Sequence, residues 1–341
     1  MSGRFCYIWT RFKNEFWIIE LLNDGAVAAD RPQRRTVPAR WIIFDYQAFI
    51  LKKQFLVYSF PLNVFSTILK LRSMLISLVG AGNVAWHLAQ ALEQTGHHIL
   101  EVYSRDLRNA KLLTKQLYDT TPVADLDFAE SKAELLILAV SDDALPVVIS
   151  QIVLPENCTV VHTSGTRSLE ELRQLIELYS DVSAQVGVFY PLQTFSKSVA
   201  IDFSEIPICV EATNRATATM LTDLAQQLSN TVYLVSSQER RVLHLAAVFA
   251  CNFTNHLLAV SQRILADSAL DFELLKPLIN ETMRKALDTP DPAAVQTGPA
   301  RRNDRQTMRQ HLDYLQIYPE WQGLYESLSA SIIKLNGGLK L

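Results

Sequence analysis

The segment GAGNVA has the residue types and the spacing of a turn that binds a dinucleotide. The apolar run MLISLV precedes it, and apolar positions at helical spacing follow it, so a strand, a glycine turn and a helix are expected in that order. Gly80 permits the tight turn, Gly82 lets the backbone approach a diphosphate, and Ala85 is small enough for the helix to pack on a sheet. The diphosphate would meet backbone N–H groups at the positive end of the helix dipole. A turn that serves packing alone is the alternative, and the context favours cofactor contacts at Gly80, Ala81, Gly82, Asn83, Val84 and Ala85.

The end of the second strand, expected at His98–Tyr103, decides which nicotinamide coenzyme fits. Glu101 lies 21 residues after Gly80, near the spacing of an acid that binds the ribose, but the strand continues beyond it and keeps it from the ribose. Ser104 and Arg105 follow the strand and suit a 2′-phosphate, which favours NADP over NAD. A solvated surface charge is the alternative for Arg105. Asp106 has the simpler role of helix N-cap.

Polar residues also follow the next two apolar strands. The run Glu134 to Val140 is typical of a central parallel strand, and it ends in Ser141 and Asp142. Ligands in open α/β sheets bind beyond the carboxyl ends of strands, so these residues are expected near the nicotinamide or ribose. The strand CTVV is followed by His162 and Ser164, to which the same logic applies. Helix caps and turns are the alternative roles; the predicted contacts are Val140, Ser141, Asp142, His162 and Ser164.

The later part of the chain carries further candidates for a substrate site. The segment VGVFYPLQTF, which contains Tyr190 and Gln193, is expected to form a strand and the loop that leaves it. In the apolar helix expected at Glu239–Ala266, the polar residues His244, Asn252 and Asn255 lie within about 80° of one another. This stripe either joins helices through hydrogen bonds or faces a substrate cleft.

A basic cluster follows in the segment QTGPARRND, which contains Thr297 and Arg302. Its arginines, with two more on the helix that follows, suit a carboxylate or a phosphate. More commonly, such charges lie on a solvent-exposed helix face, which is the alternative.

Alternating strands and helices predict an α/β, Rossmann-like doubly wound sheet at residues 74–236, and the helical pattern after Ser236 predicts an all-helical domain at 237–341. The length of 341 residues is sufficient for two domains. A net charge of −3 provides no basic field for nucleic acid. The four cysteines lack metal-ligand spacing, so no metal site is expected, and a reducing, cytoplasmic compartment is the default. No uninterrupted run of 18 apolar residues occurs, which disfavours a membrane span.

Residues 1–73 have a different composition from the rest. They hold 14 of the 31 aromatic residues, and 11 basic against 5 acidic residues give a net charge of +6. Their apolar clusters, Phe16–Leu22, Trp41–Phe44 and Phe55–Phe60, show no sustained period. An accessory domain or membrane-surface arm and a targeting segment are two interpretations. The third, which we prefer, is that Met74 is the biological start.

The motifs GAGNVA, AVSDD, VVHTSG, YPLQTF, HLAAVFACNFTNHL and QTGPARRND, in this order, resemble a family of oxidoreductases. That family joins a Rossmann-like NADP-binding domain to a helical domain of unknown function, DUF2520, and is related to deazaflavin-linked NADP reductases and pyrroline-5-carboxylate reductase. The resemblance runs from Met74 to the C-terminus. It implies a helical domain that mediates dimerisation and an interdomain cleft lined by His162, Ser164, Asn252, Thr297 and Arg302.

One position departs from the family pattern, because Tyr190 stands where relatives commonly carry a histidine before the proline. Tyr190, His162 and His244 are therefore the candidate proton donors. The leading hypothesis is an NADP-dependent oxidoreductase that transfers hydride between NADP(H) and a small carbonyl or imine compound. A non-catalytic dinucleotide-binding regulator or sensor is the alternative, since a fold alone does not fix function. We expect a homodimer with a small-molecule substrate and without nucleic-acid or membrane partners.

Overall fold

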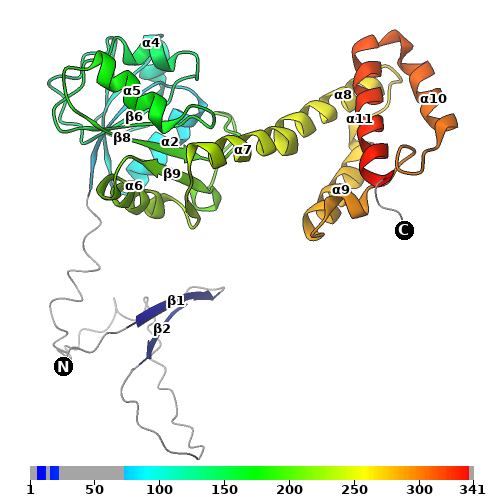
Figure 1. Ribbon diagram of the computed structural model, residues 1–341, viewed down its shortest axis with the longest axis horizontal. Helices are drawn as coiled ribbons and strands as arrows, with labels where there is room; N and C mark the ends of the chain where they lie inside the picture. The colour runs from blue at the N-terminus through cyan, green and yellow to red at the C-terminus, as the bar shows by residue number, and fades with distance from the viewer. Residues whose placement is uncertain (1–5, 13–15, 23–72, 338–341) are drawn as a thin grey trace, which may run out of the picture. The chain divides into compact units, whose positions relative to one another are not determined.

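The computed structural model describes residues 6–12, 16–22 and 73–337, and the chain divides into two units, Met1–Leu71 and Arg72–Leu341. In the first unit, strands β1 (Cys6–Phe12) and β2 (Phe16–Leu22) pair antiparallel (Figure 1). The apolar cluster at Phe16–Leu22 is therefore a strand. The clusters expected at Trp41–Phe44 and Phe55–Phe60 lie outside the described residues.

An eight-stranded, mostly parallel sheet forms the centre of the second unit, in the order β10-β9-β8-β7-β6-β3-β4-β5. Strands β3 to β8 run parallel to one another, β9 runs antiparallel to β8, and β10 is parallel to β9. This confirms the predicted Rossmann-like, doubly wound sheet. The strands are β3 (Leu75–Val79), β4 (His98–Tyr103), β5 (Thr121–Val123), β6 (Leu135–Leu138), β7 (Thr159–His162), β8 (Gln185–Pro191), β9 (Ile208–Ala212) and β10 (Val232–Leu234).

Helices cover both faces of this sheet, as its fully buried central strands require. One hydrophobic cluster joins the sheet to α2 (Asn83–Gln94), α3 (Leu107–Thr114) and α6 (Arg215–Leu228). A second cluster joins the other face to α4 (Leu145–Ile149) and α5 (Leu169–Tyr179). Burial of these apolar side chains, at about 25 cal/mol per Å², is the main stabilising contribution to this domain.

The direction of the strands places the predicted ligand-binding turns at one edge of the sheet. Because β3 to β8 are parallel, their carboxyl ends lie along the same edge. The glycine turn follows β3, Ser104 and Arg105 follow β4, and Ser164 lies just beyond β7. The sheet therefore collects segments that are far apart in the sequence.

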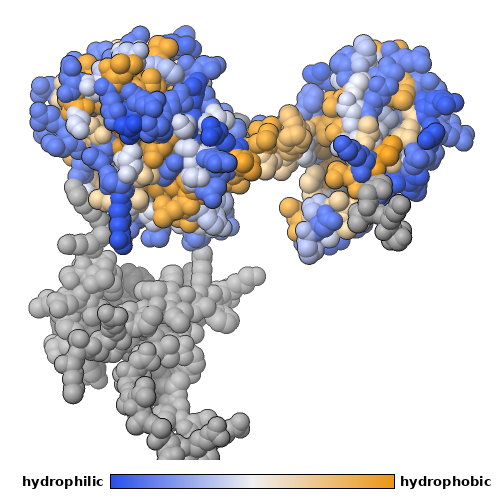
Figure 2. Space-filling view, in the orientation of Figure 1, coloured by the Kyte–Doolittle hydropathy of each residue, from blue (hydrophilic) through white to orange (hydrophobic). Residues whose placement is uncertain are grey.

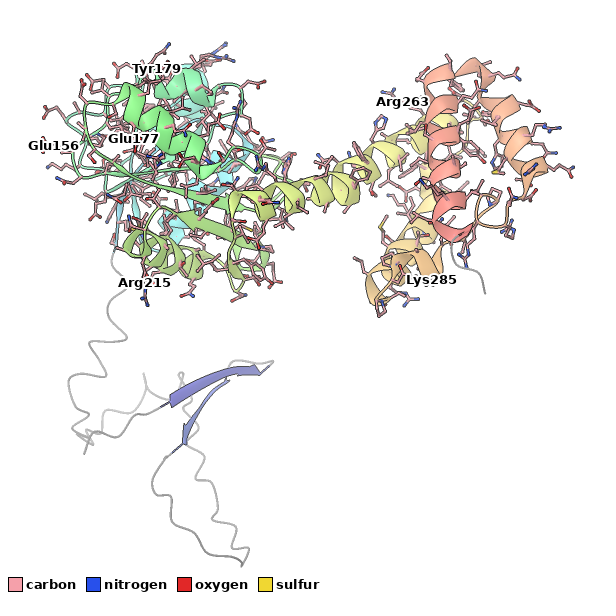
Figure 3. The ribbon with its side chains drawn as sticks, in the orientation of Figure 1. Glu156, Glu177, Tyr179, Arg215, Arg263 and Lys285 are labelled. Atoms are coloured by element: carbon pink, nitrogen blue, oxygen red, sulfur yellow. The ribbon has the colours of Figure 1, made fainter. Side chains whose placement is uncertain are left out.

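After β10 the chain is helical, as the change of pattern predicts. Helix α7 (Ser237–Ala247), the π-helix η2 (Val248–Phe253) and α8 (Thr254–Ala266) follow one another without a break. The rest of this region comprises η3 (Phe272–Leu275), α9 (Lys276–Asp288), η4 (Pro292–Val295), α10 (Arg305–Tyr314), η5 (Leu315–Ile317) and α11 (Pro319–Gly337). Charged side chains such as Arg263 and Lys285 point away from the helices into solvent, as Glu177 does on α5 (Figure 3).

The helix Ser237–Ala266 has the length and the composition of a segment that can cross a membrane. It has 30 residues, and its most apolar window has a mean hydropathy of 1.4. Its first turn, however, holds a capping box between Ser236 and Glu239, and Arg240 in the next turn is completely buried. The beginning of this helix is therefore part of the packed protein.

Candidate cofactor and substrate sites

The glycine turn after β3 combines one glycine that the fold requires with one that it does not. Gly80 has φ of +115°, and a Cβ there would lie 2.2 Å from the carbonyl oxygen of Ala139. Its N–H donates to the carbonyl of Tyr103 at 2.8 Å, which ties the turn to β4. Around Gly82, in contrast, a Cβ would meet no atom within 4 Å. A bound diphosphate must approach the backbone of this turn closely, and the open space at Gly82 leaves room for it.

The N-terminus of α2 is also suited to an anion. Gly82 is its N-cap and supplies no side-chain cap, and the first turn contains no acidic residue. Asp106 caps α3 and Asn214 caps α6 through side-chain oxygens. The first N–H groups of α2 therefore have no side-chain acceptor, and the helix dipole favours negative charge beside them. The cradle fits the diphosphate of a dinucleotide.

A cavity of about 760 Å³ extends from this turn along the edge of the sheet. It collects predicted contacts from three segments, namely Gly80, Ala81, Gly82, Ser104, Arg105, Val140 and Ser141. The remaining predicted contacts do not line it. Asn83 and Val84 lie in the first turn of α2, Ala85 is completely buried against the sheet, and Asp142 is directed elsewhere.

The carboxylates near this cavity have the local roles that the strand pattern predicts. Glu101 accepts hydrogen bonds from the hydroxyls of Ser77 and Ser131, so it is held within the sheet. Asp106 accepts from the backbone N–H of Arg108 at 3.0 Å and caps α3. Arg105 is exposed at the cavity, where it can reach a phosphate.

The turn after β7 is held together by its own polar groups. The Ser164 hydroxyl accepts from the backbone N–H groups of Thr166 and Arg167 at 3.0 and 2.9 Å. Asp142 accepts from the hydroxyl of Thr166. Burial raises the pKa of Asp142, but hydrogen bonds from Ser164 and Thr166 outweigh it, so the pKa is lowered overall. In this structure Ser164 and Asp142 act as turn-forming residues.

His162 ends β7 and has no exposed surface. Its Nδ1 accepts from the backbone N–H of Ser164 at 3.1 Å. Burial, together with the positive charge of Arg240, lowers the pKa of His162 to about 4. The side chain is therefore neutral at pH 7 and enclosed by protein, which is unfavourable for a proton donor to substrate.

The other two donor candidates form a pair between β8 and α7. The Tyr190 hydroxyl lies 3.0 Å from Nδ1 of His244. Burial, with Cys209 nearby, raises the pKa of Tyr190 to about 12. A Cβ at Gly165 would lie 2.5 Å from the same Nδ1, so only glycine allows the imidazole to occupy this place. The pair can hold and pass a proton.

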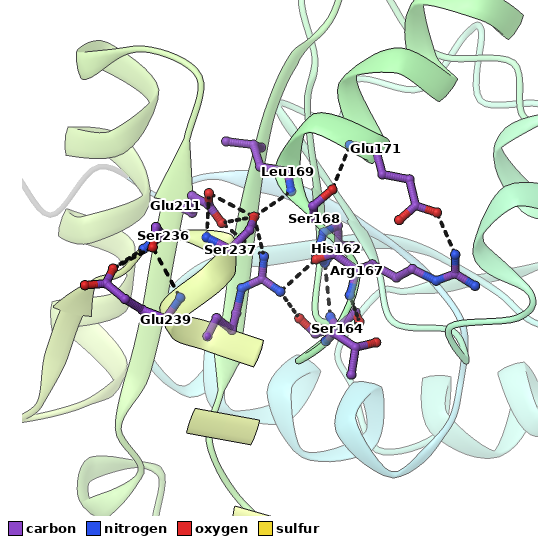
Figure 4. Close-up of polar contacts among 12 residues, drawn as sticks. His162, Ser164, Arg167, Ser168, Leu169, Glu171, Glu211, Ser236, Ser237 and Glu239 are labelled. Carbon is purple, nitrogen blue, oxygen red and sulfur yellow. Dashed lines mark hydrogen bonds and ion pairs between the residues drawn. The ribbon is translucent and has the colours of Figure 1, made fainter. Parts of the chain in front are cut away.

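A buried arginine, Arg240, fixes the beginning of α7 against the sheet through Ser164, Glu211 and Ser237, which are labelled in Figure 4. Arg240 donates to the carbonyl oxygens of Ser164 and Arg167 at 2.8 Å each, and forms an ion pair with Glu211 at 3.0 Å. Glu211 also accepts from the backbone N–H and hydroxyl of Ser237. These contacts fix the position from which α7 presents His244.

A second cavity, of about 730 Å³, lies between the segment after β8 and the polar stripe of the long helix. Three of the residues singled out in the sequence, Gln193, Asn252 and Asn255, line it. Asn252 belongs to the π-helix η2, a distortion that is often found at functional sites. Asn252 and Asn255 of the stripe therefore face a cavity, whereas His244 contacts Tyr190.

Thr297 and Arg302 lie apart from these residues in the structure. Both are exposed, and neither lines the 760 or the 730 Å³ cavity.

Sequence analysis missed two basic residues at these sites. Arg240 was not distinguished from its exposed neighbour Arg241, because both belong to an ordinary charged helix start. Lys197, which contacts the glycine turn, follows β8 and is separated from the turn by more than 100 residues. No pattern within a single segment signals such a contact.

Two family models match this chain. Residues 64–179 match a Rossmann-like domain, and residues 206–332 match the domain of unknown function DUF2520. The second match begins before β9 and therefore includes part of the sheet. A search of curated proteins found no match.

Solved structures resemble the chain over most of its length. A putative NADP oxidoreductase from Bacteroides fragilis is 41% identical, with a TM-score of 0.70, over 77% of this chain and 98% of that one. A reductive aminase from Aspergillus terreus, solved with NADPH and ethyl levulinate, is 14% identical with a TM-score of 0.54, over 79% and 100%. A 1-pyrroline-5-carboxylate reductase from Streptococcus pyogenes is 11% identical with a TM-score of 0.50, over 77% and 99%.

The last two similarities show a shared fold, whereas the Bacteroides fragilis protein is close enough in sequence to show kinship. The same family is indicated by the motifs in the sequence, by the order of the two matched domains and by this relative. The chain belongs to the family in which a Rossmann-like domain precedes a DUF2520 domain.

Proposed function

We propose that this chain is an NADP-dependent oxidoreductase that transfers hydride between NADP(H) and a small carbonyl or imine substrate. The observation that carries the proposal is the glycine turn, where Gly82 and the uncapped start of α2 leave room for a diphosphate. The family and the description of its Bacteroides fragilis member support a dinucleotide-dependent oxidoreductase. The preference for NADP rests on Ser104 and Arg105 at the 760 Å³ cavity.

The proposed division of labour places the coenzyme at the 760 Å³ cavity and the substrate at the 730 Å³ cavity, and the Tyr190–His244 pair lines neither of them. The nicotinamide supplies or accepts the hydride when bound. Reduction of a carbonyl or imine also requires a proton on the oxygen or nitrogen, and the Tyr190–His244 pair is the donor that we propose. Asn252, Asn255 and Gln193 would orient the substrate through their amide groups.

Turnover distinguishes this proposal from a dinucleotide sensor. The purified chain is mixed with NADPH and a panel of keto acids, aldehydes and imines, and loss of absorbance at 340 nm is followed. The proposal predicts turnover with at least one compound, and a loss of about 100-fold or more in kcat for Tyr190→Phe. Binding of NADPH without turnover across the panel would favour the sensor.

We further propose a cytoplasmic homodimer that forms through the long helix. Four large apolar side chains, Val242, Leu245, Phe249 and Phe253, recur at helical spacing, and each is between 49% and 64% exposed. The helix is among the most hydrophobic parts of the visible surface (Figure 2). An apolar stripe of this kind is typical of a helix that pairs with another helix. The spacing of the cysteines favours the cytoplasmic compartment.

A further inference from the structure

The segment after β8 returns to the glycine turn and is attached to α2. Phe195 stacks on the ring of His87 with centroids 5.7 Å apart, and the carbonyl of Ser196 lies 2.9 Å from Nε2 of His87. These contacts place Lys197 beside the turn. Its Nζ donates to the carbonyl oxygen of Ala81 at 2.8 Å and lies 5.3 Å from the centre of the Trp86 ring.

The position of this ammonium group suggests a second partner. The carbonyl of Ala81 is a neutral acceptor and occupies one of the three N–H donors of Lys197. The same turn presents Gly82 without a neighbour at its Cβ position, and α2 starts without an acidic residue. The ammonium of Lys197 therefore lies next to the turn whose backbone donors have no side-chain acceptor, which is a favourable setting for a doubly charged anion.

We propose that Lys197 is a coenzyme-binding residue whose ammonium contacts the diphosphate of the dinucleotide. This inference rests on the proposed function and adds a residue to its site. The Trp86 ring also stabilises the ammonium group of Lys197. The side chain is therefore held beside the glycine turn before the coenzyme binds. Rotation about the terminal bonds of its side chain lets Lys197 keep one N–H donor on the carbonyl of Ala81. The other two N–H donors then face phosphate oxygens.

The same segment also lines the 730 Å³ cavity. Gln193, Ser196 and Val199 line the 730 Å³ cavity, where we place the substrate. A contact between Lys197 and the diphosphate therefore holds one wall of the substrate cavity in place.

Isothermal titration calorimetry with NADPH tests this inference. Lys197→Ala is expected to raise the Kd for NADPH at least tenfold, because a charge-assisted contact is lost. Lys197→Arg keeps the cation and should stay within about threefold of the wild type. Lys132→Ala, at a lysine on the same domain that lies away from the glycine turn, is the matched control and should leave the Kd unchanged.

A second probe separates a phosphate contact from a general effect on the fold. Adenosine 2′-phosphate lacks the diphosphate, so the inference predicts the same affinity for it in the wild type and in Lys197→Ala. An equal loss for both ligands, or an unchanged Kd for NADPH, would overturn the role of Lys197 and leave the proposed function standing. If the wild-type chain binds neither NADPH nor NADH, the proposed function itself fails, and the inference fails with it.

Discussion

The two glycines of the turn after β3 differ in what depends on them. Gly80 is needed by the fold itself, because any side chain there would collide with the backbone of Ala139. Gly82 has no such neighbour, and we propose that it leaves space for the diphosphate. A substitution at each position should therefore separate folding from binding.

We predict that Gly82→Ala costs less than about 1 kcal/mol of stability but raises the Kd for NADPH at least tenfold. Gly80→Ala should cost about 3 kcal/mol or more, from the strained φ and the overlap with Ala139. Urea unfolding and titration calorimetry measure the two effects. Gly323→Ala, at a helical glycine with open space, is the control and should be neutral or stabilising. Normal coenzyme affinity in Gly82→Ala would contradict the assignment of the turn.

His162 gives the protein a specific dependence of stability on pH. Its pKa is about 4 in the folded protein, against 6.5 for an unperturbed histidine, so the unfolded chain binds more protons between these values. The stabilising contribution, up to about 3 kcal/mol, is complete above pH 6.5 and is lost as the pH falls toward 4. His97, whose pKa burial also lowers, acts in the same direction.

We therefore expect His162→Gln to flatten, without abolishing, the loss of stability between pH 6.5 and 4. Urea unfolding at a series of pH values measures this slope. His98→Gln removes only a neighbouring positive charge that helps to lower the pKa of His97, so it is the comparison variant and should change the slope less than His162→Gln does. An unchanged slope in His162→Gln would show that this imidazole titrates normally.

Prediction from the sequence succeeded at single residues where a local rule applies. Asp106 caps a helix, and Glu101 is retained within its strand, because both roles depend on neighbours in the chain. The burial of His162 and the role of Ser164 in its own turn were not evident, because they depend on what packs over the end of β7. That covering includes Arg240, which lies 76 residues from Ser164.

At the scale of elements, the joint between α7 and the sheet is the feature that positions the candidate proton donor. Arg240 is completely buried and supports both Ser164 and Glu211. The geometry of the Tyr190–His244 pair therefore depends on an ion pair at Arg240, one helical turn before His244.

We predict that Arg240→Met costs about 3 kcal/mol or more, because it removes the cation that pairs with the Glu211 carboxylate and the donor to two carbonyl groups. Arg241→Met, at the exposed neighbouring arginine, should change stability by less than about 0.5 kcal/mol. The free energy of unfolding in urea measures both. Equal stability of the two variants would rule out a structural role for the buried network.

Most elements of the sheet were predictable, because buried parallel strands are short apolar runs bounded by polar tips. β4 has the expected limits of His98–Tyr103, and β3, β6 and β7 differ from expectation by one or two residues, whereas the short strand β5 was not predicted. The antiparallel direction of β9 was not predictable, because the direction of a strand depends on the end of the sheet at which the connecting segment enters it. The π-helix within the long helix was also missed, since apolar spacing does not report a local change of hydrogen bonding.

For the whole molecule, the exposed apolar stripe of the long helix is the basis of the proposed homodimer. Substitution of Phe249 by Glu should abolish the proposed homodimer, because a charge would be buried at its centre. Sedimentation equilibrium of the wild type and the variant measures the change. Phe249 is 63% exposed in the single chain, so the variant should fold normally. A wild-type chain that sediments as a monomer would contradict the proposal.

The account as a whole depends on the binding of a dinucleotide at the turn Gly80 to Ala85. Titration calorimetry of the wild-type chain with NADPH, with NADH alongside and Gly82→Ala as the matched variant, tests it most directly. We predict saturable binding of NADPH with one site per chain, weaker binding of NADH, and loss of affinity in Gly82→Ala. No heat with either coenzyme at millimolar concentration, or equal affinity in Gly82→Ala, would contradict the account.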